Sequence, residues 1–152
     1  MISVIVDTKE KQPWTFDNDT QNISTKSHKL KTGDYSIEGL EEVLCIERKK
    51  SVAEFAQNIT QARFENELIR MEQYKYRFII LEFDLRHIDD FPANLPLKVR
   101  QKIKITSSYI MRRISEIQIH NQIDVIPCSN RTYAEFVATN IIKRVYEQSN
   151  KI

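Results

Sequence analysis

Hydrophobic and polar residues follow two patterns along the chain, one typical of strands and the other typical of helices. Short runs rich in β-branched and aromatic residues predict strands, and these runs cover residues 2–6, 23–30, 34–38, 43–47, 77–83 and 123–126. Apolar residues that recur every three or four positions predict helices. This spacing is found from about residue 52, around Phe64, Leu68 and Met71, over 98–120 and over 131–147.

Local signals indicate where some of these elements begin and end. Ser51 followed by Glu54 is typical of a capping box, which predicts a helix beginning at the next residue. Residues 84–97 contain two prolines and are interpreted as a loop. The helix predicted over 98–120 is expected to break near Thr106.

The order of the predicted elements indicates the fold class. Gly39 and a short acidic loop separate the strands at 34–38 and 43–47, which predicts an antiparallel hairpin. The later alternation of strands and helices predicts right-handed parallel crossovers. We therefore expect an α/β fold in which a mixed β-sheet is flanked by helices on both faces.

Length and composition indicate one globular domain. The chain has 152 residues, of which 41% are hydrophobic and 29% charged, with a net charge of +2. This near balance of charge does not by itself indicate nucleic acid, so the local distribution of charge decides. No segment approaches the roughly 18 apolar residues of a membrane span, and no basic leader precedes the first apolar run. We expect a cytoplasmic protein that does not bind membranes.

Scarce residue types exclude several kinds of site. Gly33 and Gly39 are the only glycines, so neither a P-loop nor a dinucleotide fingerprint can be assembled and no nucleotide cofactor is expected. The three histidines lie far apart in the sequence, which argues against a histidine metal site. Cys45 and Cys128 have apolar neighbours and are interpreted as buried free thiols of a reducing compartment.

Charged residues gather at the adjoining ends of the predicted hairpin. Asp34 opens one strand and Glu47 closes the other, so antiparallel pairing brings the two carboxylates together. Side chains alternate between the faces of a strand, so Lys49 shares the face of Glu47 while Arg48 faces the opposite way. We expect Asp34, Glu47 and Lys49 to share one cleft.

Two carboxylates in one cleft favour a bound cation. At about 4 Å they repel by about 4 kcal/mol at an effective dielectric constant of 20, so either one is protonated or a cation lies between them. Oxygen ligands without histidine or cysteine select Mg²⁺ or Mn²⁺. With a lysine beside it, such a metal suits phosphodiester hydrolysis. The alternative is a plain salt bridge from Lys49 to Glu47 or Asp34.

Three segments resemble the ERCC4-type nuclease domain of the XPF family: VDTKEK at 6–11, GDY at 33–35 and IERK at 46–49. That family carries V-x-D-x-R-E near its start, then G-D, then E-R-K-x-x-x-D. The segments RFENELIRMEQY, RFIILE and RRISEIQIHNQIDVIP are similar to its later helices and strands, so the resemblance covers nearly the whole chain. It implies a restriction-endonuclease-like core and metal-dependent cutting of DNA.

The resemblance also implies roles for individual residues. Metal binding falls on Asp34 and Glu47, and the role of catalytic lysine falls on Lys49. The resemblance implies a supporting acidic role for Asp7 and Glu10. Arg48 corresponds to the family's arginine and is expected to form an ion pair or a phosphate contact. The implied catalytic set is Asp34, Glu47, Lys49, Asp7, Glu10 and Arg48.

The chain departs from the family pattern at two positions. Lys9 stands where the family usually has arginine, so the positive charge remains but the bidentate fork is lost. Ala53 stands where the motif ends in aspartate, and Glu54 follows it. Glu54 either replaces that aspartate or serves only to cap its helix.

Basic residues cluster between 98 and 113, a stretch without any acidic residue. Because phosphate contacts supply most of the affinity for nucleic acid, this run is expected to hold DNA near the acidic cleft. The alternative is a solvated helix face. The residues expected to bind nucleic acid are Lys9, Lys98, Arg100, Lys102, Lys104, Arg112 and Arg113.

The resemblance also bears on domain organisation and partners. Longer family members continue into tandem helix-hairpin-helix modules, which need glycines, and this chain has none after residue 39. We therefore expect residues 1–152 to form a single ERCC4-type nuclease domain without that module. Family nuclease domains pair side by side, which implies a homodimer, with an exposed stripe on the 131–147 helix as the candidate surface.

Three functions remain open from the sequence. The first is a metal-dependent DNA endonuclease, with Mg²⁺ or Mn²⁺ as cofactor and DNA as partner. The second is a catalytically inactive, nuclease-like subunit that binds or organises DNA. The third is an unrelated α/β protein whose carboxylates are only structural. The intact set of Asp34, Glu47 and Lys49 favours the enzyme, because a binding module needs no acidic pair facing phosphate.

Overall fold

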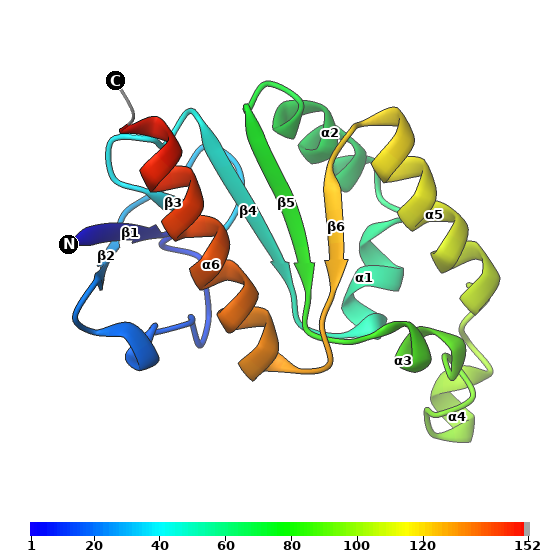
Figure 1. Cartoon of the computed structure of the whole chain (residues 1–152). Coiled ribbons are helices and arrows are strands. Elements are labelled where there is room, and N and C mark those ends of the chain that lie inside the picture. The colour runs from blue at the N-terminus through cyan, green and yellow to red at the C-terminus, as the bar shows by residue number, and fades with distance from the viewer. Residues whose placement is uncertain (151–152) are drawn as a thin grey trace.

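A computed structural model describes residues 1–150 of the chain. Its centre is one six-stranded sheet with the strand order β2-β1-β3-β4-β5-β6 (Figure 1). The strands are β1 (Ile2–Val6), β2 (Ile23–Ser27), β3 (Tyr35–Ile37), β4 (Leu44–Lys49), β5 (Tyr76–Leu81) and β6 (Asp124–Pro127). β3 pairs antiparallel with β1 and β4, whereas β1–β2, β4–β5 and β5–β6 are parallel.

Helices cover both faces of the sheet. They are α1 (Val52–Asn58), α2 (Ala62–Met71), α3 (Leu85–Asp89), α4 (Leu97–Arg100), α5 (Ser107–His120) and α6 (Arg131–Ser149), and a short 3₁₀ helix, η1, spans Asp17–Asp19. α6 crosses one face against β1, β3 and β5, and α1, α2 and α5 lie on the other (Figure 1). The predicted mixed sheet flanked by helices is therefore confirmed.

The two faces of the sheet bury two separate hydrophobic cores. Beneath α6, the apolar face of that helix packs on residues of β1, β3 and β4, including Leu44 and Ile46. On the other face, Cys45 of β4 packs with α1, α2 and α5. Every residue of β4 is buried, including its charged last three. Side chains of β4 alternate between the two cores, and the same alternation applies to its charged residues.

The structure corrects some predicted boundaries. The segment predicted as a loop, 84–97, contains α3, because Asp84 and His87 form a capping box that begins a helix. The expected break near Thr106 is confirmed: Thr106 caps α5, and α4 is a separate short helix. β2 ends at Ser27 rather than at residue 30. Between residues 1 and 150, no helix has the length and apolar character needed to cross a bilayer.

Candidate active site

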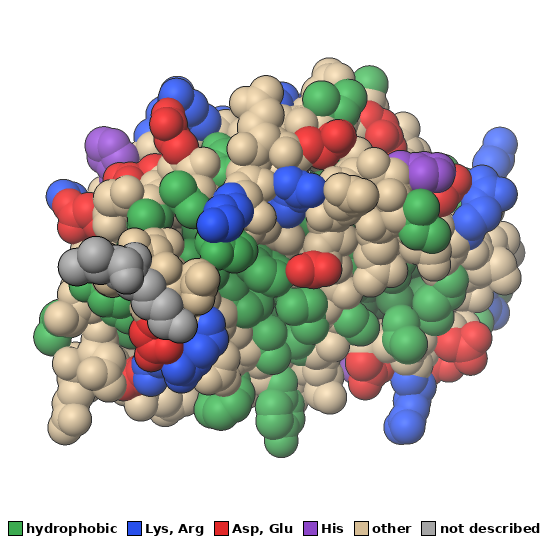
Figure 2. All heavy atoms as spheres, turned by 45° about the horizontal axis from the view of Figure 1, so that its top comes forward, with side chains coloured by type: hydrophobic (Ala, Val, Ile, Leu, Met, Phe, Trp, Pro, Cys, Tyr) green, Lys and Arg blue, Asp and Glu red, His purple; other side chains and the backbone are tan. Residues whose placement is uncertain are grey.

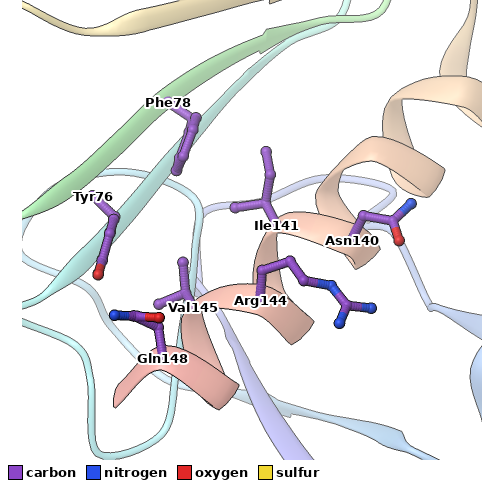
Figure 3. Close-up of a pocket in the computed structure, with 7 residues that line it drawn as sticks. All are labelled: Tyr76, Phe78, Asn140, Ile141, Arg144, Val145 and Gln148. Atoms are coloured by element: carbon purple, nitrogen blue, oxygen red, sulfur yellow. The ribbon is translucent and has the colours of Figure 1, made fainter. Parts of the chain in front are cut away.

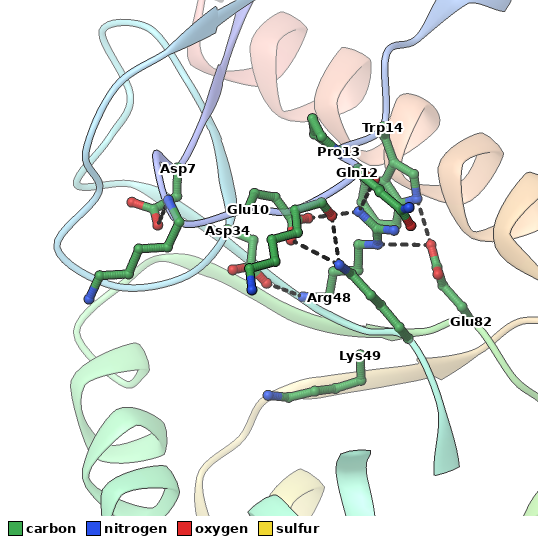
Figure 4. Close-up of polar contacts among 12 residues, drawn as sticks. Asp7, Glu10, Gln12, Pro13, Trp14, Asp34, Arg48, Lys49 and Glu82 are labelled. Atoms are coloured by element: carbon green, nitrogen blue, oxygen red, sulfur yellow. Dashed lines mark hydrogen bonds and ion pairs between the residues drawn. The ribbon is translucent and has the colours of Figure 1, made fainter. Parts of the chain in front are cut away.

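The alternation along β4 places its last charged residues on opposite faces of the sheet. Glu47 and Lys49 line a polar pocket on the α2 face, and Asp34 and Asp7 line the same pocket. Arg48 points away from it, toward Trp14 and Glu82 (Figure 4). Lys49 Nζ lies 3.3 Å from Glu47 Oε1 and 4.9 Å from the ring centroid of Phe64. The structure thus brings Asp34, Glu47 and Lys49 together, as the hairpin geometry predicted.

Backbone hydrogen bonds fix Asp34 at the edge of this pocket. Its N–H donates to Ile46 O at 2.8 Å, and its carbonyl accepts from Asp7 N at 2.8 Å. Its carboxylate Oδ2 accepts from the backbone N–H of Arg48 at 2.8 Å. The preceding Gly33 has φ +86°, and a Cβ there would lie 2.6 Å from Cys45 Sγ. Glycine is therefore required for the turn that presents Asp34.

Burial of the acidic pair perturbs its titration. Burial raises the pKa of Asp34 to about 7, although the Arg48 N–H opposes this shift. Burial also raises the pKa of Glu47 well above its usual range, and the neighbouring carboxylates of Asp34 and Glu67 add to the shift. Burial lowers the pKa of Lys49, but the charges of Glu47 and Glu67 outweigh it and leave that pKa raised. The carboxyl groups of the pocket therefore perturb one another, and a bound cation would favour their charged forms.

The donor set of this pocket fits a hard divalent cation. Arg48 N–H occupies only one of the two carboxylate oxygens of Asp34, and Glu47 is buried against like charge. Asn58 also lines the pocket, and its buried Oδ1 has no hydrogen-bond partner within the described chain. No group of three or more His, Cys, Asp or Glu side chains in residues 1–150 is placed to hold a metal. Mg²⁺ suits such a site, since it usually takes one or two carboxylates and keeps several waters.

The carboxylate of Asp7 accepts hydrogen bonds from the backbone beside the pocket. Its Oδ1 accepts from Leu30 N at 2.8 Å and its Oδ2 from Lys9 N at 3.1 Å. These bonds hold the segments that follow β1 and β2 against each other. The side chain of Lys9 is exposed at the pocket rim.

Arg48 and Glu10 belong to a buried charge network behind β4 (Figure 4). Arg48 donates to Glu82 Oε2 at 2.9 Å, to Glu10 Oε2 at 2.8 Å and to Tyr35 Oη at 3.1 Å. Its guanidinium lies 5.1 Å from the centroid of the Trp14 ring, and Trp14 Nε1 donates to Glu82 Oε2 at 2.8 Å. The expected ion pair of Arg48 is therefore present, and neither Glu10 nor Arg48 lines the pocket.

Sequence reasoning missed the contribution of α2 to the pocket. Arg63, Glu67 and Arg70 line it together with Asn58 of α1. The three α2 residues recur at spacings of four and three, on a stripe beside the buried stripe of Phe64, Leu68 and Met71. This polar stripe is visible in the sequence, but nothing local indicates that it faces Asp34 and Glu47.

The basic run between 98 and 113 lies outside the pocket, and none of its residues lines it. Lys98 and Arg100 lie on α4, and Lys102 and Lys104 follow that helix. Arg112 lies over the Tyr109 ring, and Arg113 pairs with Glu65 and Glu116. Part of this positive charge is thus neutralised within the protein.

Comparisons with known proteins identify similar folds and a matching family model. The family model described as ERCC4 domain matches residues 6–140. The structure of XPF from Aeropyrum pernix is similar, with a TM-score of 0.67 and 18% sequence identity over 99% of this chain and 62% of that chain. XPF from Aeropyrum pernix in complex with DNA gives a TM-score of 0.70 at 17% identity over 97% of this chain and 66% of that one.

No curated protein matches the chain. At these identities the solved structures show that the fold is shared. The family assignment rests on the model match, which extends from the end of β1 into α6 and includes the pocket residues of the turn before β3, of β4 and of α2. The chain therefore belongs to the ERCC4 domain family.

Proposed function

We propose that the protein is a metal-dependent endonuclease that hydrolyses phosphodiester bonds of DNA. The observation that carries the proposal is the convergence of Asp34, Glu47 and Lys49 in one pocket of a fold shared with XPF. A neighbour of this fold has been solved in complex with DNA. Members of the ERCC4 family are endonucleases, which is the activity that best uses an acidic pair beside a lysine.

Each pocket residue has a role in this proposal. Asp34 and Glu47 would hold Mg²⁺ or Mn²⁺, which activates water and polarises a phosphoryl oxygen when bound. Lys49, held by Glu47 and the Phe64 ring, faces the negative charge that develops on the phosphate. Asp7 orients the loop that carries Lys9 to the rim.

Single-turnover cleavage of single-stranded, duplex and forked DNA tests the proposal. Wild type is expected to cut at least one of these DNAs with Mg²⁺ or Mn²⁺. Glu47→Gln keeps the size of the side chain but removes its charge, so it should lose Mn²⁺ binding in calorimetry together with cutting. If wild type binds DNA but cuts none of the substrates with either metal, a catalytically inactive DNA-binding subunit is the better description.

We also propose that two copies pair through a groove on the α6 face. Tyr76 and Phe78 of β5 face Ile141 and Val145 of α6 across this groove (Figure 3). Hydrophobic side chains gather on this side of the molecule (Figure 2). Phe136, 63% exposed, lies one turn of α6 before Asn140, which also lines the groove. A groove and a protruding aromatic side chain on one surface are self-complementary, which suits a twofold interface.

The oligomeric state tests this pairing. Wild type should sediment as a dimer, and Phe136→Ser should weaken dimerisation by at least about tenfold, since burying a phenyl ring contributes about 1.5–3 kcal/mol. Ile119→Ser is the matched control, because Ile119 is 71% exposed on α5. A monomeric wild type, or equal weakening by the two variants, would contradict the interface.

The buried free thiols Cys45 and Cys128 suit the reducing, cytoplasmic location that we propose.

A further inference from the structure

The acidic pocket has a basic rim. Its floor consists of buried side chains, among them Asp7, Glu47 and Lys49. The side chains at its mouth are exposed and basic, and they come from three separate parts of the chain: the segment after β1, the segment before β3, and α2. These residues, which we call the basic rim, are Lys9, Lys31, Arg63 and Arg70.

The charges of the basic rim are largely available to a ligand. Among residues 1–150, none of the ion pairs involves Lys9, Arg63 or Arg70. Arg70 Nε donates only to the hydroxyl of Thr32, at 3.3 Å. Lys31 pairs with Glu42 at 3.3 Å, but both side chains are at least 80% exposed, and such pairs contribute little.

The rim extends beyond the pocket. Lys31, Thr32 and Arg70 line a second hollow as well, together with Glu42, Gln73 and Tyr74. The two hollows are therefore adjacent, and Lys31 and Arg70 of the basic rim lie between them. A linear polyanion that crosses the pocket would continue along this second hollow, whereas a small anion would need only one of the two.

Building on the endonuclease proposal, we infer that the basic rim binds the phosphodiester backbone of one nucleic acid strand. One phosphate then lies over Lys49, and its neighbours lie on Arg63, Arg70, Lys31 and Lys9. These positive charges offset the repulsion between the strand and the carboxylates of the floor. Because contacts to phosphate carry no sequence information, the binding is independent of base sequence.

This assignment differs from the surface that the sequence indicated. In the 98–113 run, Arg113 is committed to Glu65 and Glu116, and Arg100 donates to the carbonyl of Ala93. Lys102 and Lys104 are exposed and line a different hollow, next to α1. The two surfaces can be separated by experiment, because each offers a pair of exposed basic residues that can be neutralised.

The experiment measures the affinity for a single-stranded oligonucleotide by fluorescence anisotropy over a range of salt concentrations, without divalent metal. The double variant Arg63→Ala/Arg70→Ala should make the negative slope of log K against log salt shallower by up to about 1.4, at roughly 0.7 per lost contact to a single strand. Lys102→Ala/Lys104→Ala, which removes the same charge, should change it less. Arg63→Lys/Arg70→Lys keeps the charge and should retain most of the wild-type slope.

The outcome decides the inference independently of catalysis. Equal or larger loss of slope in Lys102→Ala/Lys104→Ala would overturn it, as would an unchanged slope in Arg63→Ala/Arg70→Ala. Circular dichroism must show a folded alanine variant, and the lysine variant provides the comparison if it does not. Binding is measured without metal, so a wild type that binds here but cuts no DNA in the cleavage assay with Mg²⁺ or Mn²⁺ would refute the endonuclease proposal and leave the rim assignment standing.

Discussion

The two faces of β4 carry charged side chains that are buried to nearly the same extent but have different partners. Glu47 and Lys49, on the pocket face, are 7% and 6% exposed, and Arg48, on the other face, is 3% exposed. Arg48 is surrounded by acceptors that satisfy it. Burial raises the pKa of Glu47, and the carboxylates of Asp34 and Glu67 that it faces raise that pKa further. The exposed fractions are nearly equal, so the two faces differ in the partners of their buried charges.

The largest expected effect comes from breaking the Arg48 network. Arg48→Ala leaves the carboxylates of Glu10 and Glu82 buried without their cation, and breaking a buried pair in this way costs about 3–5 kcal/mol. Urea denaturation should show this loss in the free energy of unfolding. Lys50→Ala is the control, because Lys50 is half-buried and lies 4.0 Å from Glu10, so it should cost less than about 1 kcal/mol.

On the pocket face, the corresponding change should affect chemistry more than stability. Lys49→Ala is expected to lower single-turnover cleavage about a hundredfold or more, which is the usual cost of losing a preorganised group that meets transition-state charge. Lys49 is no metal ligand, so Mn²⁺ binding should persist. Loss of folding comparable to that of Arg48→Ala would show that the two faces do not differ as described.

A milder change sharpens the comparison from the network side. Trp14→Phe keeps an aromatic ring near Arg48 and Tyr35 but removes the Nε1–H bond to Glu82. Hydrogen bonds to charged groups contribute about 1.5–3 kcal/mol, so the free energy of unfolding should decrease by an amount in that range. Cleavage by the folded fraction should equal that of wild type. Slower chemistry at full folding would mean that the network also tunes the pocket.

The smallest expected effect is a pH dependence confined to the pocket face. Burial raises the pKa of Asp34 to about 7 in the folded protein, so without metal the folded state binds more protons than the unfolded state. The stability from protonated Asp34 is complete below about pH 4 and is lost as pH rises to 7, by at least about 1 kcal/mol.

Thermal melts in chelator across this pH range measure the loss. Asp34→Asn removes the titrating group and should flatten the profile, while Arg48→Lys should keep its slope. A profile that stays equally steep in Asp34→Asn would assign the pH dependence to other groups.

The features of the site that the sequence predicts are those that depend on short-range geometry. The hairpin and the period of two placed Asp34, Glu47 and Lys49 together and turned Arg48 away. The partners of Arg48 were beyond reach, because Glu10 and Glu82 lie 38 and 34 residues from it in the chain. Their positions depend on how the N-terminal loop and the end of β5 pack around β4.

The α2 contribution was missed for a similar reason. Arg63, Glu67 and Arg70 form an ordinary polar stripe of an amphipathic helix, and only the docking of α2 on the sheet turns it toward Asp34. The basic run from 98 to 113 shows the same limit. Its density in the sequence predicts a binding surface, but the pairing of Arg113 with Glu65 of α2 is a contact that no local pattern shows.

The bond from the Arg48 N–H to Asp34 Oδ2 has an evolutionary consequence. Residue 48 serves the pocket through its main chain and the interior through its side chain, so the two duties can diverge separately. A lineage could exchange Arg48, Glu10 and Glu82 together for apolar side chains of similar volume, which is often neutral or stabilising, while Asp34 keeps its anchor. Proline is the one residue type that would end both duties at once, since it has no N–H to donate.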